Sequence, residues 1–373
     1  MFEGELVKGL IAGMDKNYTD NYDFYRFGPE PAAKNGSLTL KQRLVGLVNS
    51  KGYYNLSAYK DDFQKKLSVQ LEQNREGIKH CGILYNLLAD EQSKGLLVNL
   101  LCYHILGYKK VKLPLSKPQY WEQIKKIGEL QDKSDTIKPG FMGFILYKTD
   151  LKPLGYPVKL YFTQMGIMTD FVVKQYEYKS GETTIKADTG NVVVDAGACW
   201  GDTALYFAAE TGASGAVYSF EFIPTNIEIF NKNIALNPQL KDAIHVVKAP
   251  LWDVSGTKVF YRDNGPGSKI SFTKEDDLPG ETTTLTLDDW CIKENPAKID
   301  FIKMDIEGAE MNALLGAEQT IRKFRPKLAI CVYHQWQDFS RIATWINNLG
   351  LGYKFYLSHS TIHIEETVLF ARA

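Results

Sequence analysis

Three acidic side chains and a histidine follow two apolar runs in the last quarter of the chain. Asp305, Glu307 and Glu310 fall within the stretch IDFIKMDIEGAE, and His334 ends the run KLAICVYH. Crowded carboxylates repel one another and require a cation, a proton or helix N–H groups nearby. The spacing therefore indicates removal of a proton from an acceptor, contact with a positively charged ligand, or a divalent metal site formed by Asp305, Glu307 and His334. The structural alternative is helix capping by Asp305 or Glu307, with Glu310 in the favourable first turn of the helix.

Two histidines are candidates for the base that would accept such a proton. One is His334, and the other is His359, in the stretch YKFYLSHSTIHIEETVLFARA near the end of the chain. Histidine titrates near neutrality, so either ring could accept a hydroxyl proton. Asp305 and Glu307 would then orient the base or hold a metal ion. His363, a few residues farther on, is expected to be solvated.

A second group of candidates surrounds two glycines upstream. In VVVDAGACWGDTALYFA, Asp195 ends an apolar run, and Ala196, Gly197 and Gly201 lead into a helical pattern that includes Thr203. Glycine lets the backbone pass close to a ligand, and a helix amino terminus offers free N–H groups to an anionic group. We expect these residues to line a small-molecule site. A plain strand-to-helix turn is the structural alternative.

The glycine spacing does not match a dinucleotide-binding loop. Cys199 stands where the fingerprint GxGxxG has its second glycine, so a pyrophosphate is disfavoured. The loop suits an amino-acid carboxylate better, which makes a nicotinamide-dependent oxidoreductase the weaker enzyme hypothesis.

Three further residues could contact a nucleoside. Glu221 ends the run VYSFEF, and its carboxylate could accept two hydrogen bonds from a ribose diol. It could instead be an acid placed before the helix expected from Pro224. Trp252 could flank an adenine and Asp253 could accept from its exocyclic amine; core packing and a turn are the alternatives for these two.

The elements that must position these residues are short strands separated by helices. Apolar runs such as NVVVDAG, GAVYSFEF, AIHVVKA, KIDFIKMD and KLAICVYH alternate with helical patterns from residue 191 onward. Strands that are apolar throughout are buried on both faces, which predicts a doubly wound, Rossmann-like α/β domain over residues 191–373. Ligands of such sheets bind beyond the carboxyl ends of the strands, where the candidate residues fall.

The preceding half of the chain has a different texture. Helical spacing of apolar residues from about Leu40 to Tyr108 predicts a mainly helical region over residues 1–110. Prolines and short alternating runs, VKLYFTQM and TTIKADTGN among them, predict a mixed adaptor segment over residues 111–190. His104 is interpreted as a histidine packed on the flank of a helix.

Composition narrows the class of partner. Lysine plus arginine equals aspartate plus glutamate at 44 each, which argues against nucleic acid or an anionic membrane as the main partner. The five cysteines are odd in number and widely spaced, so neither a disulfide framework nor a zinc or iron–sulfur site is indicated. With no basic leader and no apolar run of about 18 residues, a cytoplasmic protein without a membrane span is expected.

With these motifs together, the chain resembles the FkbM-type methyltransferases, a branch of the class I S-adenosylmethionine-dependent enzymes. The motifs that carry the resemblance are VVVDAGACWGDTALYFA, VYSFEFIPTN, IDFIKMDIEGAE, PKLAICVYH and the tail YKFYL…ETVLFA. The resemblance covers about 190–373, and LADEQSKGLLVNLLCYHILG extends it over about 86–108. It implies a seven-stranded sheet in which a terminal hairpin supplies the last two strands and makes one strand antiparallel.

The resemblance also implies an activity. It implies transfer of a methyl group from S-adenosylmethionine to a hydroxyl, often on a sugar of a glycan or of a secondary metabolite. Where many relatives carry arginine before the histidine of the tail, this chain has Ser358. By motif, the resemblance places on the cofactor side Asp195, Gly197, Gly201 and Glu221, and on the acceptor side Asp305, Glu307 and His334.

Several alternatives stay open. A non-catalytic binding or scaffold protein could keep the same fold, and a divalent metal and a homo-oligomer remain undetermined. Methylation of a nucleic acid is disfavoured because the fourth strand ends in MDIEGAE rather than in a (D/N)PPY-like sequence.

Overall fold

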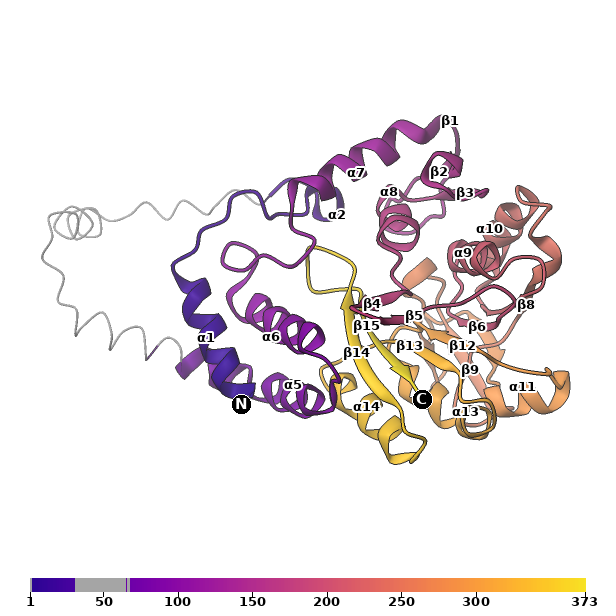
Figure 1. The fold of residues 1–373 in the computed structure, drawn as a ribbon. Helices are drawn as coiled ribbons and strands as arrows, with labels where there is room; N and C mark the ends of the chain where they lie inside the picture. Colours follow the sequence, from indigo (N-terminus) through magenta and orange to yellow (C-terminus); the bar gives the residue numbers. More distant parts are fainter. Residues whose placement is uncertain (1, 31–64, 66–67) are drawn as a thin grey trace, which may run out of the picture.

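A computed structural model describes residues 2–30, 65 and 68–373 of the chain (Figure 1). The helical pattern expected between about Leu40 and residue 64 lies outside the described residues. The carboxyl-terminal half forms one central sheet with helices on both faces. The amino-terminal helices and a small mixed α/β segment pack against this half (Figure 1).

The central sheet has seven strands in the order β14-β15-β13-β12-β6-β7-β8. All neighbouring strands are parallel except β15, which runs antiparallel to both β13 and β14. The expected α/β sheet with one antiparallel strand in a terminal hairpin is therefore confirmed. The strands are β6 (Val192–Ala196), β7 (Ala216–Phe220), β8 (Ile244–Val247), β12 (Phe301–Met304), β13 (Lys327–Cys331), β14 (Lys354–His359) and β15 (Thr367–Arg372).

Burial on both faces explains why the central strands appear as continuous apolar runs. All of β12 and nearly all of β6 and β13 is buried. Val193 and Val194 belong to two different hydrophobic cores, as the alternation of side chains along a strand requires. The chain order reverses between β6 and β12, so their carboxyl ends form the topological switch point of the sheet.

Helices of the carboxyl-terminal half cover both faces of the sheet. Helices α9 and α10 share a core with the adaptor segment, whereas α12, α13 and α14 share a core with the amino-terminal helices. Their bounds are α9 (Asp202–Thr211), α10 (Pro224–Ala235), α11 (Leu287–Glu294), α12 (Glu310–Leu315), α13 (Glu318–Phe324) and α14 (Asp338–Asn348), with a short 3-10 turn, η3, at Lys241–Ala243.

The amino-terminal helices extend the core at the outer edge of the sheet. Helix α5 (Arg75–Leu87) lies beside α14, and α6 (Glu91–Leu106) lies beside β14. Helix α1 (Phe2–Met14) packs on α5 and α6 from outside (Figure 1), and the short α2 (Phe24–Phe27) follows α1. Helix α6 ends at Gly107, which has a φ of 81°. His104 packs edge-on against Trp336 with ring centroids 4.6 Å apart. This agrees with the prediction of a histidine packed on the flank of a helix.

The adaptor segment is a mixture of helices and small antiparallel sheets. Its longest helix, α7, leads into a three-stranded sheet in the order β1-β2-β3. The amino-terminal helices share one hydrophobic core with the central sheet, and the adaptor segment shares the other. The domain boundaries at residues 110 and 190 therefore stay a prediction. The elements are α7 (Pro118–Leu130), β1 (Gln131–Ile137), β2 (Leu146–Asp150), η1 (Lys152–Leu154), β3 (Lys159–Phe162), α8 (Gln164–Ile167), a π-helix, η2 (Met168–Val173), β4 (Tyr178–Ser180) and β5 (Thr183–Ile185).

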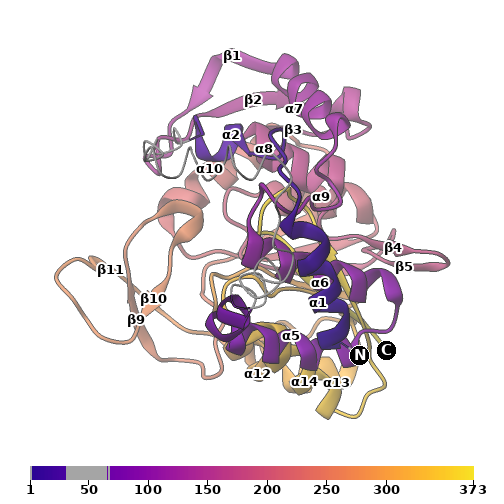
Figure 2. The same ribbon diagram turned by 90° about the vertical axis from the view of Figure 1, so that its left-hand side faces the viewer.

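An insertion between β8 and α11 forms a separate three-stranded antiparallel sheet, which the sequence analysis did not predict. Figure 2 shows this sheet projecting from the body of the molecule. It consists of β9 (Lys258–Tyr261), the turn η4 (Gly265–Gly267), β10 (Ile270–Ser271) and β11 (Gly280–Thr283). Its turn reaches the carboxyl edge of the central sheet.

One expectation for the tail is wrong. His363 was expected to be solvated, but it is only 4% exposed. Its Nε2 lies 3.6 Å from a carboxylate oxygen of Asp23, and its ring packs edge-on against Phe27. The segment after α1 covers the loop between β14 and β15, a contact between distant parts of the chain that local polarity cannot reveal.

Within the described ranges, no helix is long and apolar enough to cross a membrane.

The contact between α6 and β14 can be tested through one buried hydroxyl. Ser93 Oγ accepts the backbone N–H of Leu357 at 2.9 Å and lies 3.1 Å from Tyr178 Oη. Ser93→Ala would leave that N–H buried without a partner, so we expect a loss of about 1–3 kcal/mol in the free energy of unfolding. Chemical denaturation followed by circular dichroism measures it.

Ser134→Ala is the control, because Ser134 is exposed and its two hydrogen bonds run to the nearby Asp132, in the irregular part of β1. It should change stability by less than about 0.5 kcal/mol. Equal losses in the two variants would contradict the docking role of Ser93.

Candidate active site

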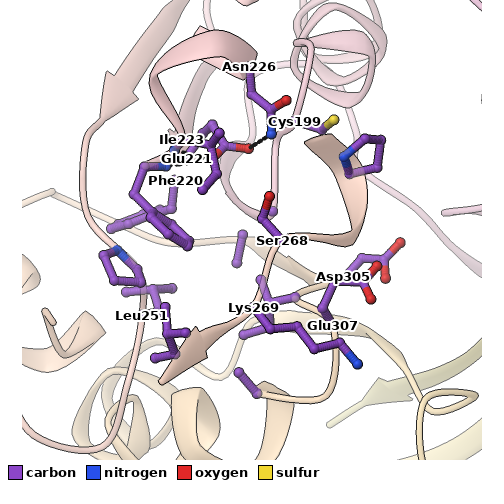
Figure 3. Close-up of a pocket in the computed structure, with 18 of the residues that line it drawn as sticks. Cys199, Phe220, Glu221, Ile223, Asn226, Leu251, Ser268, Lys269, Asp305 and Glu307 are labelled. Carbon is purple, nitrogen blue, oxygen red and sulfur yellow. Dashed lines mark hydrogen bonds between the residues drawn. The ribbon is translucent and has the colours of Figure 1, made fainter. Parts of the chain in front are cut away.

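A pocket opens at the carboxyl ends of β6, β7 and β12, at the switch point of the sheet (Figure 3). Its cavity volume is about 190 Å³. One water molecule needs about 10–15 Å³ on the same measure, so the cavity admits a small organic molecule. The lining residues are Ala196, Gly197, Cys199, Phe220, Glu221, Phe222, Ile223, Asn226, Ala249, Pro250, Leu251, Trp252, Gly265, Pro266, Ser268, Lys269, Ile270, Asp305, Ile306, Glu307, Gly308 and Ala309.

The glycines of the first loop are required by backbone geometry. Gly197 has a φ of 84°, and a Cβ there would lie 1.9 Å from the carbonyl oxygen of Asp305. Gly201 has a φ of 83°, and a Cβ there would lie 2.1 Å from the ring of Phe230. Of the two, only Gly197 lines the pocket, together with Ala196. Gly201 therefore fits the structural alternative, a tight turn into α9.

Asp195 lies beneath this loop and does not line the pocket. Its carboxylate is fully buried and pairs with Lys303 Nζ at 3.1 Å. It also accepts hydrogen bonds from the hydroxyls of Thr203 at 2.9 Å and Ser219 at 3.2 Å. Asp195 and Thr203 thus support the loop from inside the sheet, without direct access to a ligand in the cavity.

Lys303 is the central cation of the site, and the sequence analysis missed it. Its Nζ donates to the carbonyl oxygens of Ala196 at 3.1 Å and Gly197 at 2.7 Å. Burial by itself would lower the pKa of Lys303, but the carboxylates of Asp195 and Asp305 outweigh it and raise that pKa. The available signal was a lone lysine inside an otherwise apolar strand, FIKM.

Glu221 lines the pocket on the side opposite Asp305 (Figure 3). Its side chain is only 6% exposed. One carboxylate oxygen accepts the backbone N–H groups of Phe222 and Ile223, and the other accepts Asn226 Nδ2 at 3.1 Å. Burial raises the pKa of Glu221 to about 7 despite these hydrogen bonds. Glu221 can therefore exchange its proton near neutrality, and Asn226 is a pocket residue that the sequence analysis did not name.

The loop after β8 places Trp252 in the pocket but not Asp253. Trp252 lines the cavity beside the buried Leu251. Asp253 does not line it, because its carboxylate turns away and accepts Asn312 Nδ2 at 2.8 Å. The structural alternative fits Asp253 better than contact with a nucleoside base.

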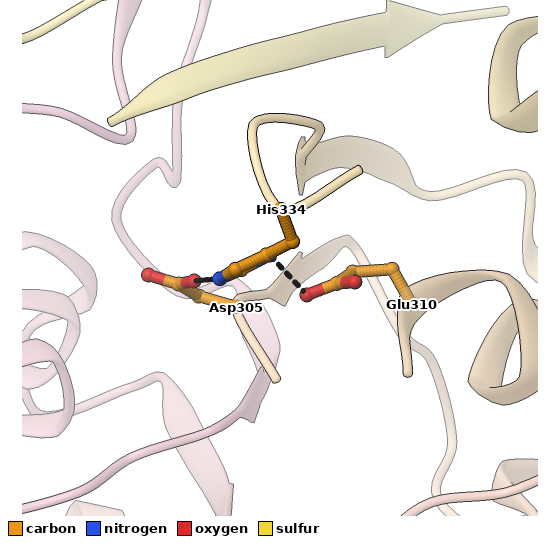
Figure 4. Close-up of side chains that lie close together, drawn as sticks. All are labelled: Asp305, Glu310 and His334. Carbon is orange, nitrogen blue, oxygen red and sulfur yellow. Dashed lines mark ion pairs between the residues drawn. The ribbon is translucent and has the colours of Figure 1, made fainter. Parts of the chain in front are cut away.

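The acid cluster surrounds His334, as expected from sequence, although the innermost acid is Glu310 (Figure 4). Asp305 and Glu307 line the pocket. His334 Nε2 lies 3.6 Å from Asp305 and 3.8 Å from Glu307, and Nδ1 lies 3.1 Å from Glu310. The fully buried Glu310 also accepts the backbone N–H of Ile306 at 2.8 Å.

The charge state of His334 follows from this enclosure. Burial disfavours the charged ring, but the neighbouring carboxylates of Glu307, Glu310 and Asp305 favour it and raise the pKa of His334 to about 11. The ring therefore holds a proton at neutral pH and compensates the crowded carboxylates. Glu307 adopts a φ of 59°, a backbone conformation that costs energy for a residue with a side chain and that clusters at functional sites.

The same residues provide the donor set for a metal ion. Asp305, Glu310 and His334 each place a ligand atom within 4.8 Å of the others. Glu310 replaces the expected Glu307 in this group. The two carboxylates approach opposite nitrogens of the ring (Figure 4), so a common ion would require one of these side chains to turn. As placed, the carboxylates of Asp305 and Glu310 form ion pairs with opposite nitrogens of a protonated imidazole.

His359 is not brought into the pocket. It ends β14 at the outer edge of the sheet, where Nδ1 lies 2.9 Å from Thr367 Oγ1 and Nε2 lies 3.3 Å from Thr361 Oγ1. Burial lowers the pKa of His359 to about 4. The enclosed, neutral ring is a structural histidine in this arrangement.

Comparison with known proteins identifies the domain that carries the pocket. The family model described as a methyltransferase FkbM domain matches residues 195–355. Residues 195–355 are therefore similar to a methyltransferase FkbM domain. The resemblance expected from the motifs is confirmed over these residues, and with it S-adenosylmethionine as the cofactor of the domain.

Individual relatives are distant. A 2-O-methyltransferase, NoeI, of Sinorhizobium fredii is 34% identical over 87 residues, which cover 23% of this chain and 32% of that protein. The chain thus spans about a third of the length of this curated relative. The crystal structure of a methyltransferase FkbM from Methylobacillus flagellatus is 18% identical with a TM-score of 0.49 and covers 81% of this chain and 60% of that one. Fibrillarin from Aeropyrum pernix, solved with bound S-adenosylmethionine, is 10% identical with a TM-score of 0.38 and covers 62% of this chain and 90% of that one.

The raised pKa of Glu221 predicts a pH-dependent affinity for S-adenosylhomocysteine, the demethylated cofactor. A ribose diol donates to the ionised carboxylate, so binding favours the deprotonated form. Affinity should therefore rise with pH through about 7, by up to roughly tenfold between pH 6 and 8. Isothermal titration calorimetry across this range measures it.

Glu221→Gln is the matched control, since the amide has the same shape but does not titrate in this range. It should bind more weakly and lose the dependence on pH. An unchanged pH profile in this variant would assign the titration to another group and contradict the ribose contact.

Proposed function

We propose that the protein transfers the methyl group of S-adenosylmethionine to a hydroxyl oxygen of an acceptor, on a sugar of a glycan or of a secondary metabolite. The observation that carries the proposal is that Glu221 and Asp305 line one pocket from opposite sides, at the switch point of the sheet. This arrangement offers separate places for a nucleoside and for an acceptor. The name of the relative NoeI, a 2-O-methyltransferase, supports oxygen as the atom that receives the methyl group.

The cofactor would lie across the three loops of the pocket. The aminobutyrate part would rest on the loop at Gly197, where the backbone is exposed without a side chain. The ribose would meet Glu221, and the adenine would pack beside Leu251 and Trp252. The sulfonium would then lie toward Asp305, whose negative charge favours it.

Asp305 is the base in this proposal. Methyl transfer from a sulfonium mainly requires alignment of the two reactants and removal of the acceptor proton. A base must be free of its proton, and His334 already holds one at neutral pH. His359 lies outside the pocket lining. Asp305 lines the pocket, and the positive His334 beside it would stabilise the carboxylate.

The charges around the acceptor position favour a neutral acceptor. Asp305 and Glu307 both line this side of the pocket and outnumber Lys269, the lysine that also lines it, while the positive charge of His334 is shared with the buried Glu310. An acceptor with a phosphate or carboxylate beside its hydroxyl would be repelled by these two acids. An uncharged sugar hydroxyl meets no such cost.

The activity is tested with the purified full chain, methyl-labelled S-adenosylmethionine and a panel of neutral and anionic glycans. We expect label in a neutral acceptor as an alkali-stable methyl ether, and a fall in turnover of about 10²–10⁴-fold in Asp305→Asn. Saturable cofactor binding without label transfer to any acceptor would favour a non-catalytic binding protein instead.

Asp300→Asn is the control for Asp305→Asn, because it also removes one carboxylate beside β12. Asp300 precedes β12 at the opposite end of the strand and accepts the backbone N–H of Val192 at 2.7 Å, which an amide oxygen can also do. This variant should retain turnover.

The pH profile of turnover shows whether His334 stays protonated and compensates the carboxylates or instead acts as the base. Because the pKa of His334 is raised to about 11, the ring stays protonated below that value and should produce no step between pH 6 and 9. His334→Ala should cut turnover with cofactor affinity nearly unchanged. A step near pH 6.5 that disappears in this variant would make His334 the base, and loss of cofactor binding would place it on the cofactor side.

A further inference from the structure

The carboxylate of Asp305 is held by a tyrosine on each oxygen. Tyr333 Oη donates to Oδ1 at 3.1 Å, and Tyr176 Oη donates to Oδ2 at 3.2 Å. Tyr333 lies just beyond β13, within residues 195–355 that match the methyltransferase family model. Tyr176 comes from the adaptor segment, before this match begins. The proposed base is therefore oriented from two parts of the chain.

Two phenol hydroxyls can fix the orientation of a carboxylate and still leave some of its hydrogen-bond acceptor positions free. An ionised carboxylate offers about four lone-pair positions, and the two tyrosines take one on each oxygen. Rotation of the group would break both bonds, while lone pairs remain free for an acceptor hydroxyl. In the absence of the phenols, Asp305 could turn toward the positive ring of His334, 3.6 Å away.

Tyr176 is itself held firmly in place. It is 2% exposed, and its ring lies 5.4 Å from Lys303 Nζ, the cation that supports the cofactor loop. The preceding residue, Gln175, donates to a carboxylate oxygen of Glu366 at 2.9 Å, beside the last strand of the sheet. These contacts join the adaptor to β12 and to the residue before β15.

The π-helix that leads to Tyr176 makes a further contact with the methyltransferase domain. Asp170, in this helix, is buried beside Asp202 at the start of α9. Burial and the neighbouring carboxylate raise the pKa of Asp170 well above its usual value, so the two acids can share a proton. The segment is thus packed against both α9 and β12.

We propose that Tyr176 is a positioning residue of the active site, which orients the carboxylate of Asp305 for the acceptor hydroxyl. The adaptor segment thereby supplies part of the acceptor half of the site. This inference rests on the proposed function for its catalytic consequence, whereas the placement of Asp305 can be observed directly.

Tyr176→Phe and Tyr206→Phe form a matched pair for the test. Tyr206 is also buried, and its hydroxyl donates to the carboxylate of Glu177 at 2.8 Å, next to Tyr176 in sequence. Each variant removes one phenol-to-carboxylate bond from the same region. Only Tyr176→Phe removes one from Asp305.

Steady-state kinetics with the full chain should separate the two variants. Tyr176→Phe should lower kcat by about 10–100-fold, since small misplacements of a reacting group have effects of this size, and leave the KM and Kd for S-adenosylmethionine within about threefold. Tyr206→Phe should keep kcat. The double variant Tyr176→Phe/Tyr333→Phe should lose little beyond the worse single variant, because both phenols act on one group.

Crystal structures of both variants with S-adenosylhomocysteine provide a readout independent of activity. Asp305 should turn away from the acceptor position in Tyr176→Phe and keep it in Tyr206→Phe. An unmoved Asp305 with full turnover in Tyr176→Phe, or equal kinetic losses in both variants, would overturn the proposal. If Asp305 turns as expected but the wild-type chain methylates no acceptor, the positioning contact is supported and the proposed function fails.

Discussion

The ion pair between Lys303 and Asp195 is the constraint on which the rest of the site depends. Both groups are fully buried at adjacent positions of neighbouring strands, β12 and β6. Removing one partner of such a pair commonly costs about 3–5 kcal/mol because the other charge is left without compensation. The same ammonium group holds the carbonyl oxygens of Ala196 and Gly197, so the charge that stabilises the sheet also shapes the glycine loop that lines the pocket.

A second cation organises the other half of the pocket. His334 lies among carboxylates that would otherwise repel one another, and their combined charge keeps its ring protonated. In each half a positive group lies behind the acids that line or support the cavity. This leaves Glu221, Asp305 and Glu307 available to a ligand, with their backbone positions fixed by the strand ends and by the turn at Gly308.

The fold and the edge of the sheet that carries the site could be predicted from sequence because both depend on local patterns. Buried parallel strands appear as apolar runs, and the residue after each run marks the carboxyl edge, as for Asp305 and Glu221. The partners behind them could not be predicted. Lys303 and Asp195 are more than 100 positions apart, Tyr176 belongs to another segment, and Asp253 and His359 follow strands yet are turned away by contacts with Asn312 and Thr367.

The turn of the insertion, η4, borders the pocket and rests on the adaptor. A Cβ on Gly265 would lie 3.1 Å from Phe141, while Ser268 and Lys269 beside it line the cavity. This wall comes from an insertion outside the seven-stranded sheet that holds the Lys303 pair. Coordinated changes in these two surface segments can therefore reshape one wall of the cavity while the strand ends beneath it stay intact.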